Sequence, residues 1–302
     1  MATPEQFVDA LNAIFGKQQP GARAVHAKGI VMSGTFTPSA AAASVSKAAH
    51  LQKSAVSVTV RFSDFAGVPT IPDADAGATP HGMALRFRLP DGSETDIVTH
   101  SFNGFPTANV DEFLEFAIAL GQSGPTAPKP TALDKFLSTH PIAKSFLESL
   151  QPPPASYATL SFFGVNTFKF TSAFDKTTFG RYQIRPVAGE KFLSKEQIAS
   201  ADPNYLTNEM RERLARGAVE FKLNLEVADS GDALNDPSIA WPAARTKIEL
   251  GTIALTQMAA DSAAAERELL FNPVPNTAGI EVHDPMIEVR SKVYLVSFRR
   301  RH

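Results

Sequence analysis

An arginine and a tyrosine lie four residues apart near the end of the chain, in the segment Arg290-Ser-Lys-Val-Tyr294. Residues four apart share a helix face, so the guanidinium of Arg290 would lie against the phenol oxygen of Tyr294. A free phenol has a pKa of about 10 and is a poor metal ligand at neutral pH. A guanidinium beside it stabilises the phenolate, and a bound iron(III) ion stabilises it further. The pair could therefore hold the iron of a haem, although the same spacing also suits a plain stacking pair on a helix surface.

A histidine that could carry out acid-base chemistry lies near the other end of the chain, in Arg23-Ala-Val-His26-Ala-Lys-Gly29. Imidazole titrates close to neutral pH, so it can take and return a proton during catalysis. Apolar neighbours such as Val25 and Ile30 are equally compatible with a core histidine that has no chemical role. If the two segments act together, the fold must bring them to one place.

Alternation of apolar and polar residues is the dominant pattern between these two segments. Along 219–227, every second residue is Val, Phe or Leu, which predicts a strand with one buried face. Strands are predicted at 22–36, 55–63, 83–89, 95–102, 164–171, 178–186, 219–227 and 246–256, the last with a bulge at Gly251. Eight antiparallel strands favour a closed barrel, because closure removes exposed strand edges.

Helices interrupt the strands. Asn109 is expected to cap a helix that buries Phe113 and Phe116, and Glu112 completes a capping-box pattern. Further helices are predicted at 131–150, 194–200 and 204–216, while 258–268 could be a loop or a short helix. The proline-rich breaks resemble connections more than domain linkers. We therefore expect residues 1–302 to form one α+β domain, an eight-stranded antiparallel β-barrel with inserted and flanking α-helices.

Composition excludes several classes of function. The chain has 302 residues, and its formal net charge of −2 gives no general attraction to nucleic acid or acidic membranes. It has no cysteine, which rules out disulfides, thiolate ligands and iron–sulfur clusters. The first residues lack a basic segment followed by an apolar one, and no apolar run approaches about 18 residues. We expect a cytoplasmic protein without a membrane span.

The segments around His26 and Tyr294 closely resemble two segments of haem catalases, the distal-histidine strand and the proximal ligand with its arginine. Further segments resemble that family in the same order: Val60-Arg61-Phe62-Ser63, His81-Gly82-Met83-Ala84-Leu85-Arg86-Phe87, Asp96-Ile97-Val98, Gly164-Val165-Asn166-Thr167-Phe168-Lys169, Trp241-Pro242, Phe271-Asn272-Pro273 and Gly279-Ile280-Glu281. The order and spacing are kept over almost the whole chain, although Asn166 stands where the family has a histidine. The chain is therefore identified as a member of the catalase superfamily.

The resemblance implies a catalytic site built around haem b, iron protoporphyrin IX. Tyr294 would be the proximal ligand of the haem iron, supported by Arg290. His26 would be the distal acid and base, held in its tautomer by Ser63. Asp284, just before the proximal helix, would cap that helix or pair with Arg290, and capping is the favoured interpretation.

The same resemblance implies which residues would bind the rest of the cofactor. Arg23, Arg61 and Arg301 resemble the arginines that bind the haem propionates, and a planar guanidinium suits a carboxylate. The distal side of the haem would be lined by three apolar residues, Val25, Phe105 and Phe113. Without the resemblance, Arg61 would be an ordinary barrel residue and Arg301 part of a solvated basic end.

Two departures from the family bear on the reaction. An ungapped alignment from Asp96 places His100 where the family has its distal asparagine, whereas a three-residue shift would place Asn103 there. The chain ends at His302, eight residues after Tyr294, as minimal catalase-related peroxidases do. We thus expect it to lack the long N-terminal arm and C-terminal extension of full-length catalases.

These features favour a haem peroxidase that reduces hydrogen peroxide or organic hydroperoxides with electrons from an organic donor. A true catalase and a fatty-acid hydroperoxide isomerase like allene oxide synthase are the enzymatic alternatives. A haem-binding or sensing barrel without turnover is the alternative of another class. A homodimer is suggested by the reduced family architecture, and no nucleic-acid partner is expected.

Overall fold

The computed structural model describes residues 2–16 and 19–302. Within them, nine strands form one antiparallel sheet in the order β4-β3-β2-β1-β8-β7-β6-β5-β9. The strands are β1 Gly29–Pro38, β2 Val56–Ser63, β3 Gly82–Arg88, β4 Glu94–His100, β5 Phe162–Thr171, β6 Thr177–Pro186, β7 Val219–Val227, β8 Lys247–Met258 and β9 Ile280–Val282. Strand β4 also pairs with β5, so β1 to β8 close into a barrel and β9 adds to the side of β5. The predicted eight-stranded barrel is confirmed, whereas the short strand β9 was not predicted.

The apolar residues of the alternating sequence pattern fill the interior of the barrel. On β2 and β3, for example, Val60, Phe62, Met83 and Leu85 are fully buried in the main core. The predicted bulge at Gly251 is also present, because the register between β7 and β8 passes from Gly251 to Glu249 and leaves out Leu250. The residues between these positions point outward, and some of them, such as Ser57 on β2 and Arg88 on β3, are exposed to solvent.

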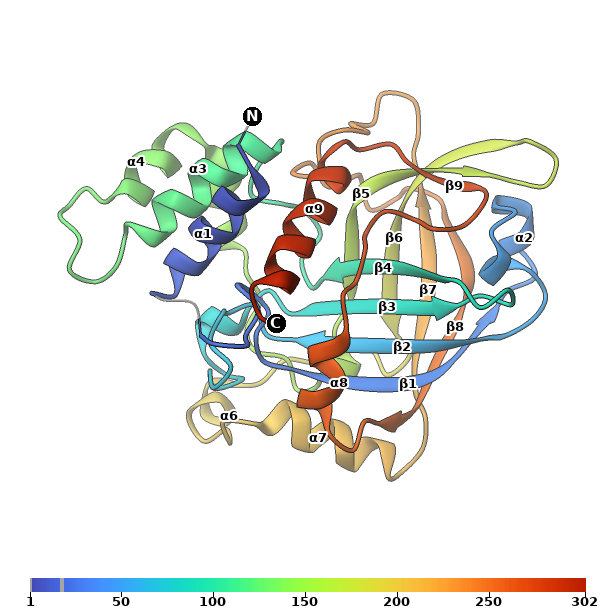
Figure 1. Ribbon diagram of the computed structural model, residues 1–302, viewed down its shortest axis with the longest axis horizontal. Helices are drawn as coiled ribbons and strands as arrows, with labels where there is room; N and C mark the ends of the chain where they lie inside the picture. Colours follow the sequence, from blue (N-terminus) through green and yellow to red (C-terminus); the bar gives the residue numbers. More distant parts are fainter. Residues whose placement is uncertain (1, 17–18) are drawn as a thin grey trace.

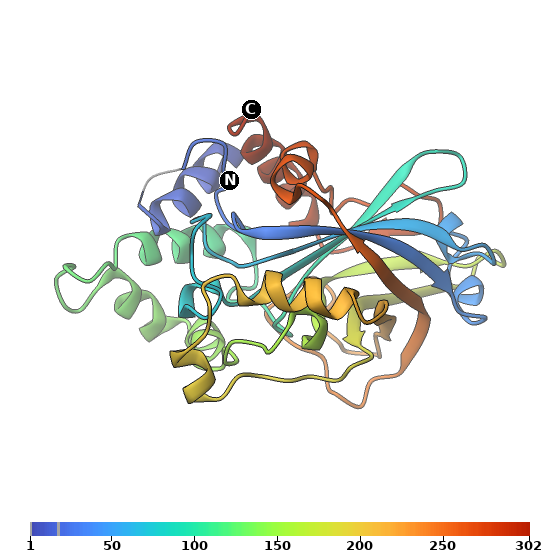
Figure 2. The same cartoon turned by 90° about the horizontal axis from the view of Figure 1, so that it is seen from below.

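Most of the helices gather at one end of the barrel and along one side of it, whereas α2 lies at the opposite end (Figure 1, Figure 2). They are α1 Pro4–Ile14, α2 Ala42–Val45, α3 Val110–Gly121, α4 Ala132–Thr139, α5 Pro141–Glu148, α6 Lys195–Ala199, α7 Tyr205–Leu214, α8 Ser262–Glu268 and α9 Met286–Arg299. Helix α1 packs against α3 and α9 through a small apolar cluster that includes Phe7, Leu11, Ala117 and Val293. Figure 1 shows these three helices at the end of the barrel where β2 and β4 finish and β3 begins.

Two predicted elements differ from the structure, and both differences have a local cause. The helix expected at 131–150 is two helices, because Pro141 disfavours the helical conformation at His140, whose φ and ψ are −123° and 77°. The strand expected at 22–36 begins only at Gly29. Before it, the backbone N–H groups of His26 and Ala27 donate to the carbonyl oxygens of Phe65 and Ala66 at 2.7 and 2.9 Å, so the chain turns out of the ladder.

Helix α1 was not predicted, although its start carries a readable signal. Thr3 and Gln6 form a reciprocal capping box, and Pro4 is the first helical residue. Among the described residues, no helix combines the length and the apolar character needed to cross a membrane.

Candidate active site

One row of residues crosses the end of the barrel and provides the floor of the site. In the strand register, Gly29 is paired with Ser63, Ser63 with Gly82, Gly82 with His100, and His100 with Phe163. Directly paired residues present their side chains to the same face of a sheet. The neighbouring Phe62 and Met83 point into the core, so Ser63 and His100 point outward, with a glycine between them that leaves room above the sheet.

Glycine leaves the space that Ser63 and His26 occupy. A Cβ atom at Gly82 would lie 2.7 Å from Ser63 Oγ, a distance that real Cβ atoms essentially never show, and 3.0 Å from His26 Nδ1, which is also unusually short. Gly82 lies in one of the segments that resemble the catalase family, but nothing in the sequence itself indicated why the position must be glycine.

His26 lies against this row, in a strained backbone conformation. Its Nδ1 atom is 3.1 Å from Ser63 Oγ, and its ring meets the edge of Phe65 at 5.5 Å between centroids. Its φ of 58° is uncommon for a residue with a side chain and is held by the backbone bonds to the segment 65–66. Burial, followed by the nearby charge of Arg61, lowers the pKa of His26 to about 3. His26 is therefore a neutral imidazole across the physiological pH range.

His100 is the second imidazole of the site. Both of its ring nitrogens are buried and have no hydrogen-bond partner among the described residues. Burial, followed by the charge of Arg290, lowers its pKa to about 3. His100 lines both of the cavities that His26 lines, and Asn103 lines neither of them. Of the two residues considered for the position of the family's distal asparagine, the structure thus places His100 in the site.

Arg290 and Tyr294 are joined as their spacing predicted. They lie on α9, where Arg290 Nη2 donates a hydrogen bond of 2.8 Å to Tyr294 Oη. Arg290 Nη1 donates to Asn166 Oδ1, and Asn166 Nδ2 donates to Asp284 Oδ2 at 2.7 Å. The other oxygen of Asp284 accepts the backbone N–H of Met286, the first residue of α9, at 2.9 Å. Asp284 therefore accepts a backbone hydrogen bond at the start of α9, and Asn166 links it to Arg290.

Asn166 owes its position to an irregularity in β5. The register between β5 and β6 shifts between Gly164 and Phe168, and Asn166 lies inside this shift. The resemblance marked Asn166 as a departure from the family but did not reveal its link to Arg290. An amide suits this place because it can donate to the carboxylate and accept from the guanidinium at once.

A cluster of three arginines lies beside the site with a single carboxylate. Arg61 Nη2 donates to Glu266 Oε2 at 2.9 Å and to the carbonyl oxygen of His26 at 2.8 Å. Arg23 donates to the carbonyl oxygens of Glu266 and Leu269 at 3.1 and 2.9 Å, and Arg301 donates to Leu269 at 2.6 Å. Burial, and then the charges of Arg61 and Arg301, lower the pKa of Arg23. The cluster has three positive charges and one negative charge.

This arrangement fits a ligand with two carboxylates. The Nε atoms of Arg61 and Arg301 are buried and have no hydrogen-bond partner in the described part of the chain, so the cluster retains donors as well as an excess charge of two. The two propionates of a haem would supply the missing negative charges. The resemblance predicted a role for the three arginines. Glu266 was not predicted, because nothing in its alanine-rich segment indicated a functional residue.

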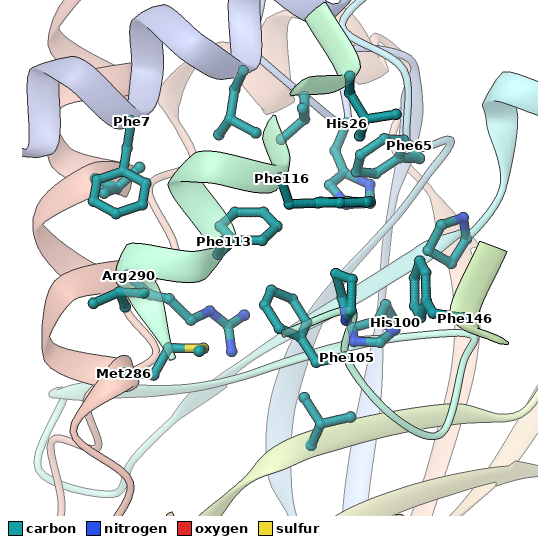
Figure 3. A pocket seen from close by; sticks show the side chains of 18 of the residues that line it. Phe7, His26, Phe65, His100, Phe105, Phe113, Phe116, Phe146, Met286 and Arg290 are labelled. Atoms are coloured by element: carbon teal, nitrogen blue, oxygen red, sulfur yellow. The ribbon is translucent and has the colours of Figure 1, made fainter. Parts of the chain in front are cut away.

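Two adjoining cavities meet at the residues already described. Both are lined by Val25, His26, His100, Arg290 and Tyr294. Figure 3 shows the rings of Phe65, Phe105, Phe113, Phe116 and Phe146 around the first cavity, which aliphatic side chains also line. Phe105 and Phe113 were expected here, while Phe65, Phe116 and Phe146 were not, because their helix and loop positions are brought in only by the tertiary fold.

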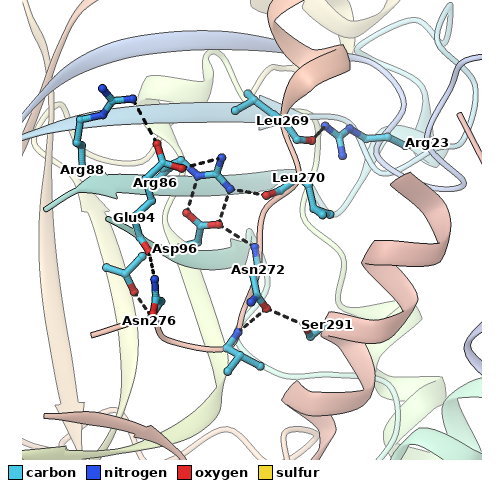
Figure 4. A network of polar contacts seen from close by, with 12 residues as sticks. Arg23, Arg86, Arg88, Glu94, Asp96, Leu269, Leu270, Asn272, Asn276 and Ser291 are labelled. Carbon is cyan, nitrogen blue, oxygen red and sulfur yellow. Dashed lines mark hydrogen bonds and ion pairs between the residues drawn. The ribbon is translucent and has the colours of Figure 1, made fainter. Parts of the chain in front are cut away.

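A polar network ties the barrel to α9 (Figure 4). Arg86 on β3 and Asp96 on β4 form two parallel hydrogen bonds of 2.9 Å each. Asp96 also accepts the backbone N–H of Asn272 at 2.8 Å, and Asn272 Oδ1 accepts from Ser291 on α9 at 2.8 Å. The crossing segment 269–276 is thereby fixed, and its Leu270 and Phe271 line the second cavity. The network holds the helix of Tyr294 at a set position over the strands that carry Ser63 and His100.

Comparison with known proteins agrees with this arrangement. A family model described as Catalase matches residues 5–302. A catalase-related peroxidase of Mycolicibacterium paratuberculosis is 35% identical over 99% of this chain and 95% of its own length. A catalase-related peroxidase of Synechococcus elongatus is 31% identical over 99% of this chain and 88% of its own.

Longer relatives match over part of their length. Catalase-2 of Bacillus subtilis is 26% identical over 89% of this chain, which corresponds to 42% of that protein. The crystal structure of a fungal catalase superimposes with a TM-score of 0.83 at 20% identity, over 96% of this chain and 61% of the other, and therefore shares the fold. The family match over nearly the whole sequence and the high identity to the shorter relatives agree, and the chain belongs to the catalase family.

Proposed function

We propose that this protein is a haem-dependent peroxidase that reduces hydrogen peroxide or organic hydroperoxides with electrons from an organic donor. The observation that carries the proposal is the placement of two pairs around the same cavities, His26 with Ser63 and Tyr294 with Arg290. The arginine cluster, with its excess charge of two, supports haem as the group that these pairs serve. The two relatives named catalase-related peroxidases support the same assignment.

Each pair has a distinct task in this proposal. In the overall reaction the O–O bond breaks, the donor loses two electrons and two protons, and the products are an alcohol or water, a second water and the oxidised donor. A bound haem, which we propose to be haem b, supplies the redox chemistry at its iron, and the protein supplies orientation and proton transfer. Tyr294 would hold the iron as a phenolate, which Arg290 stabilises by its hydrogen bond.

His26 would move a proton between the two oxygen atoms of the peroxide. With its Nδ1–H donating to Ser63 Oγ, the Nε2 lone pair is free to accept a proton from one oxygen and return it to the other. The depressed pKa of His26 keeps that lone pair available. We propose His100 as the second catalytic residue, whose unpartnered ring nitrogens can bind and orient the peroxide. Val25, Phe105 and Phe113 would keep water from the site.

A donor-dependent assay separates this proposal from its alternatives. We expect the haem-loaded protein to consume peroxide rapidly only when an organic electron donor is present, because imidazole replaces the amide that binds a second peroxide in true catalases. Stopped-flow absorbance and an oxygen electrode would follow the reaction with and without donor. Rapid oxygen release without donor would instead identify a catalase.

A second candidate function is favoured by the aromatic wall of the first cavity. A lipid hydroperoxide could enter an apolar cavity of this kind and be rearranged without any donor. Product analysis with a fatty-acid hydroperoxide would detect the epoxide or its hydrolysis products. If the protein turned over neither peroxide nor lipid hydroperoxide, the remaining interpretation would be a barrel that binds haem without catalysis.

The peroxide reaction is expected to be insensitive to mild acid. Because the pKa values of His26 and His100 are both lowered to about 3, neither imidazole gains a proton between about pH 7 and about pH 5. The second-order rate constant with peroxide, measured by stopped flow across this range, should stay constant. A fall centred near the ordinary histidine pKa of about 6.5 would show that the acid-base group is an exposed histidine elsewhere.

We also propose a cellular setting and an assembly state for the enzyme. The small formal net charge of −2 and the absence of cysteine agree with an enzyme that works in the cytoplasm without nucleic-acid partners. A homodimer is proposed from the reduced family architecture. Residues 1–302 are proposed to act as one haem-binding domain.

A further inference from the structure

A buried polar cluster outside the two cavities lies directly behind His26. It consists of Lys28, Asp64, Asp73, His81 and Tyr157, and we call it the Asp64 cluster. Tyr157 Oη donates a hydrogen bond of 2.7 Å to Asp64 Oδ1, and His81 Nε2 lies 3.5 Å from the same oxygen. Lys28 Nζ forms an ion pair with Asp73, and Asp73 Oδ2 accepts the backbone N–H of Leu206 at 2.7 Å.

The charges of this cluster do not balance unless one carboxyl keeps its proton. Lys28 is its one ammonium group, and burial lowers the pKa of His81 to about 3, so His81 is neutral. Asp64 and Asp73 are both buried, and their carboxyl groups are close enough to interact electrostatically. Two carboxylates in such contact repel one another, and one of them therefore stays protonated. Tyr205, on the neighbouring α7, adds only a phenol, and burial raises the pKa of that phenol further above its ordinary value.

Asp64 is the carboxyl that keeps the proton. Lys28 neutralises Asp73, whereas Asp64 faces a phenol and a neutral imidazole. Burial, and then the charge of Asp73, raise the pKa of Asp64 to about 8, while the hydrogen bond from Tyr157 opposes this shift. In this state the cluster as a whole is neutral.

The cluster is attached to the backbone that positions His26. The N–H of Asp64 donates to the carbonyl oxygen of Lys28 at 3.0 Å, and the N–H of His26 donates to Phe65 at 2.7 Å. Lys28 Nζ also donates to the carbonyl oxygens of Ile71 and Pro203, each at 2.7 Å. The left-handed backbone of His26 thus depends on a segment anchored by the Lys28 ammonium.

We propose that Asp64 is a neutral carboxylic acid in the working enzyme and a positioning residue for His26, and that its deprotonation at alkaline pH displaces the 26–28 segment and slows the peroxide reaction. A second carboxylate would repel Asp73 and compete with it for the Lys28 ammonium. Both effects pull on the hydrogen bonds that hold residues 26–28 against residues 64–66. The kinetic part of this proposal rests on the proposed function, while the protonation state of Asp64 does not.

The protonation state has a consequence for stability with a definite sign. An aspartate in an unfolded chain loses its proton near pH 4, whereas the folded protein keeps the proton on Asp64 until about pH 8. Between these values the folded state holds one more proton, so the free energy of unfolding falls as pH rises. Above about pH 8 this contribution becomes constant. Asparagine cannot titrate, so Asp64→Asn removes the slope.

The experiment compares the haem-loaded wild-type protein with Asp64→Asn and with Asp175→Asn, a control that changes an exposed aspartate. In the wild type we expect the rate constant with peroxide to fall about fivefold around pH 8. The rate of Asp64→Asn should not change with pH over this range, and the control should follow the wild type. Relative to Asp64→Asn, the unfolding equilibrium constant of the wild type should rise about tenfold per pH unit between pH ~5 and ~7.

A second variant tests the direction of the effect. Tyr157→Phe removes the hydrogen bond that favours the carboxylate of Asp64, so the alkaline transition should move to higher pH. Infrared difference spectra should show a protonated carboxyl band that disappears through the same transition and is absent from Asp64→Asn. A transition unchanged in Asp64→Asn, or a wild type without that carboxyl band, would overturn the proposal. If no variant reacts with peroxide but the band and the stability slope are present, the proposed function fails while the assignment of Asp64 stands.

Discussion

Tyr294→Phe is expected to abolish the charge-transfer absorption of a tyrosinate-bound haem and to weaken haem binding by more than about 100-fold. Removing a residue that only hydrogen-bonds a metal ligand usually lowers metal affinity by about 10- to 100-fold. Removing the ligand itself should lower haem affinity by more. Phenylalanine keeps the ring of Tyr294 and its packing but removes the oxygen that accepts the 2.8 Å hydrogen bond from Arg290. The guanidinium would then retain Asn166 as its side-chain partner and would face the cavity without an anion.

Absorbance titration of the purified apoprotein with haem would measure both effects. Tyr205→Phe is a suitable control, because it also removes one phenol oxygen, the one that donates to the carbonyl of Pro154 at 2.6 Å, and leaves the cavities untouched. A Soret band and charge-transfer band that survive in Tyr294→Phe would show that another group holds the iron. The control should bind haem as the wild type does.

His26→Asn is expected to lower the rate constant with peroxide by about 10²–10⁴-fold while leaving the tyrosinate spectrum intact. That range is the usual value of positioned proton transfer. Asparagine is chosen because it tolerates the left-handed backbone found at His26, so the loop should keep its shape. An amide also occupies the place above Ser63 but cannot accept a proton at neutral pH.

Single-turnover stopped-flow measurements at several peroxide concentrations would give this rate constant. His302→Asn, at the exposed end of the chain, is the matched control for loss of an imidazole. If His26→Asn reacted as fast as the wild type, the proton would have to move through another group, and His100 would be the first to test. A loss of haem from His26→Asn, detected in its spectrum, would separate a folding defect from a chemical one.

The parts of the site that could be predicted are those whose geometry is local or whose residues carry a family pattern. Arg290 and Tyr294 meet because helix geometry alone brings residues four apart together. The barrel followed from alternation that persists over most strands. The split at Pro141 was not predicted, although proline restricts the residue before it and therefore marks a possible helix boundary.

The remaining features depend on contacts that no short pattern specifies. His26 adopts a positive φ although it is not glycine, because backbone bonds to residues 65–66 over-determine it. Glu266 and Asn166 acquire their partners from segments far away in the sequence. The buried pairing of Asp64 with Asp73 is likewise set by tertiary packing, and charge patterning along the chain gives no hint of it.

The row of residues across the end of the barrel also determines when the site can exist. His100 lies at the one residue pair that joins β4 to β5 in the described structure, Ser63 lies two strands away, and Tyr294 lies on a helix that follows every strand in sequence. A one-residue slip of β3 would replace the gap at Gly82 with a methionine or histidine side chain. We therefore expect haem to bind only once β4 and β5 have paired, so retention of the cofactor on heating should report whether the seam between β4 and β5 is still closed.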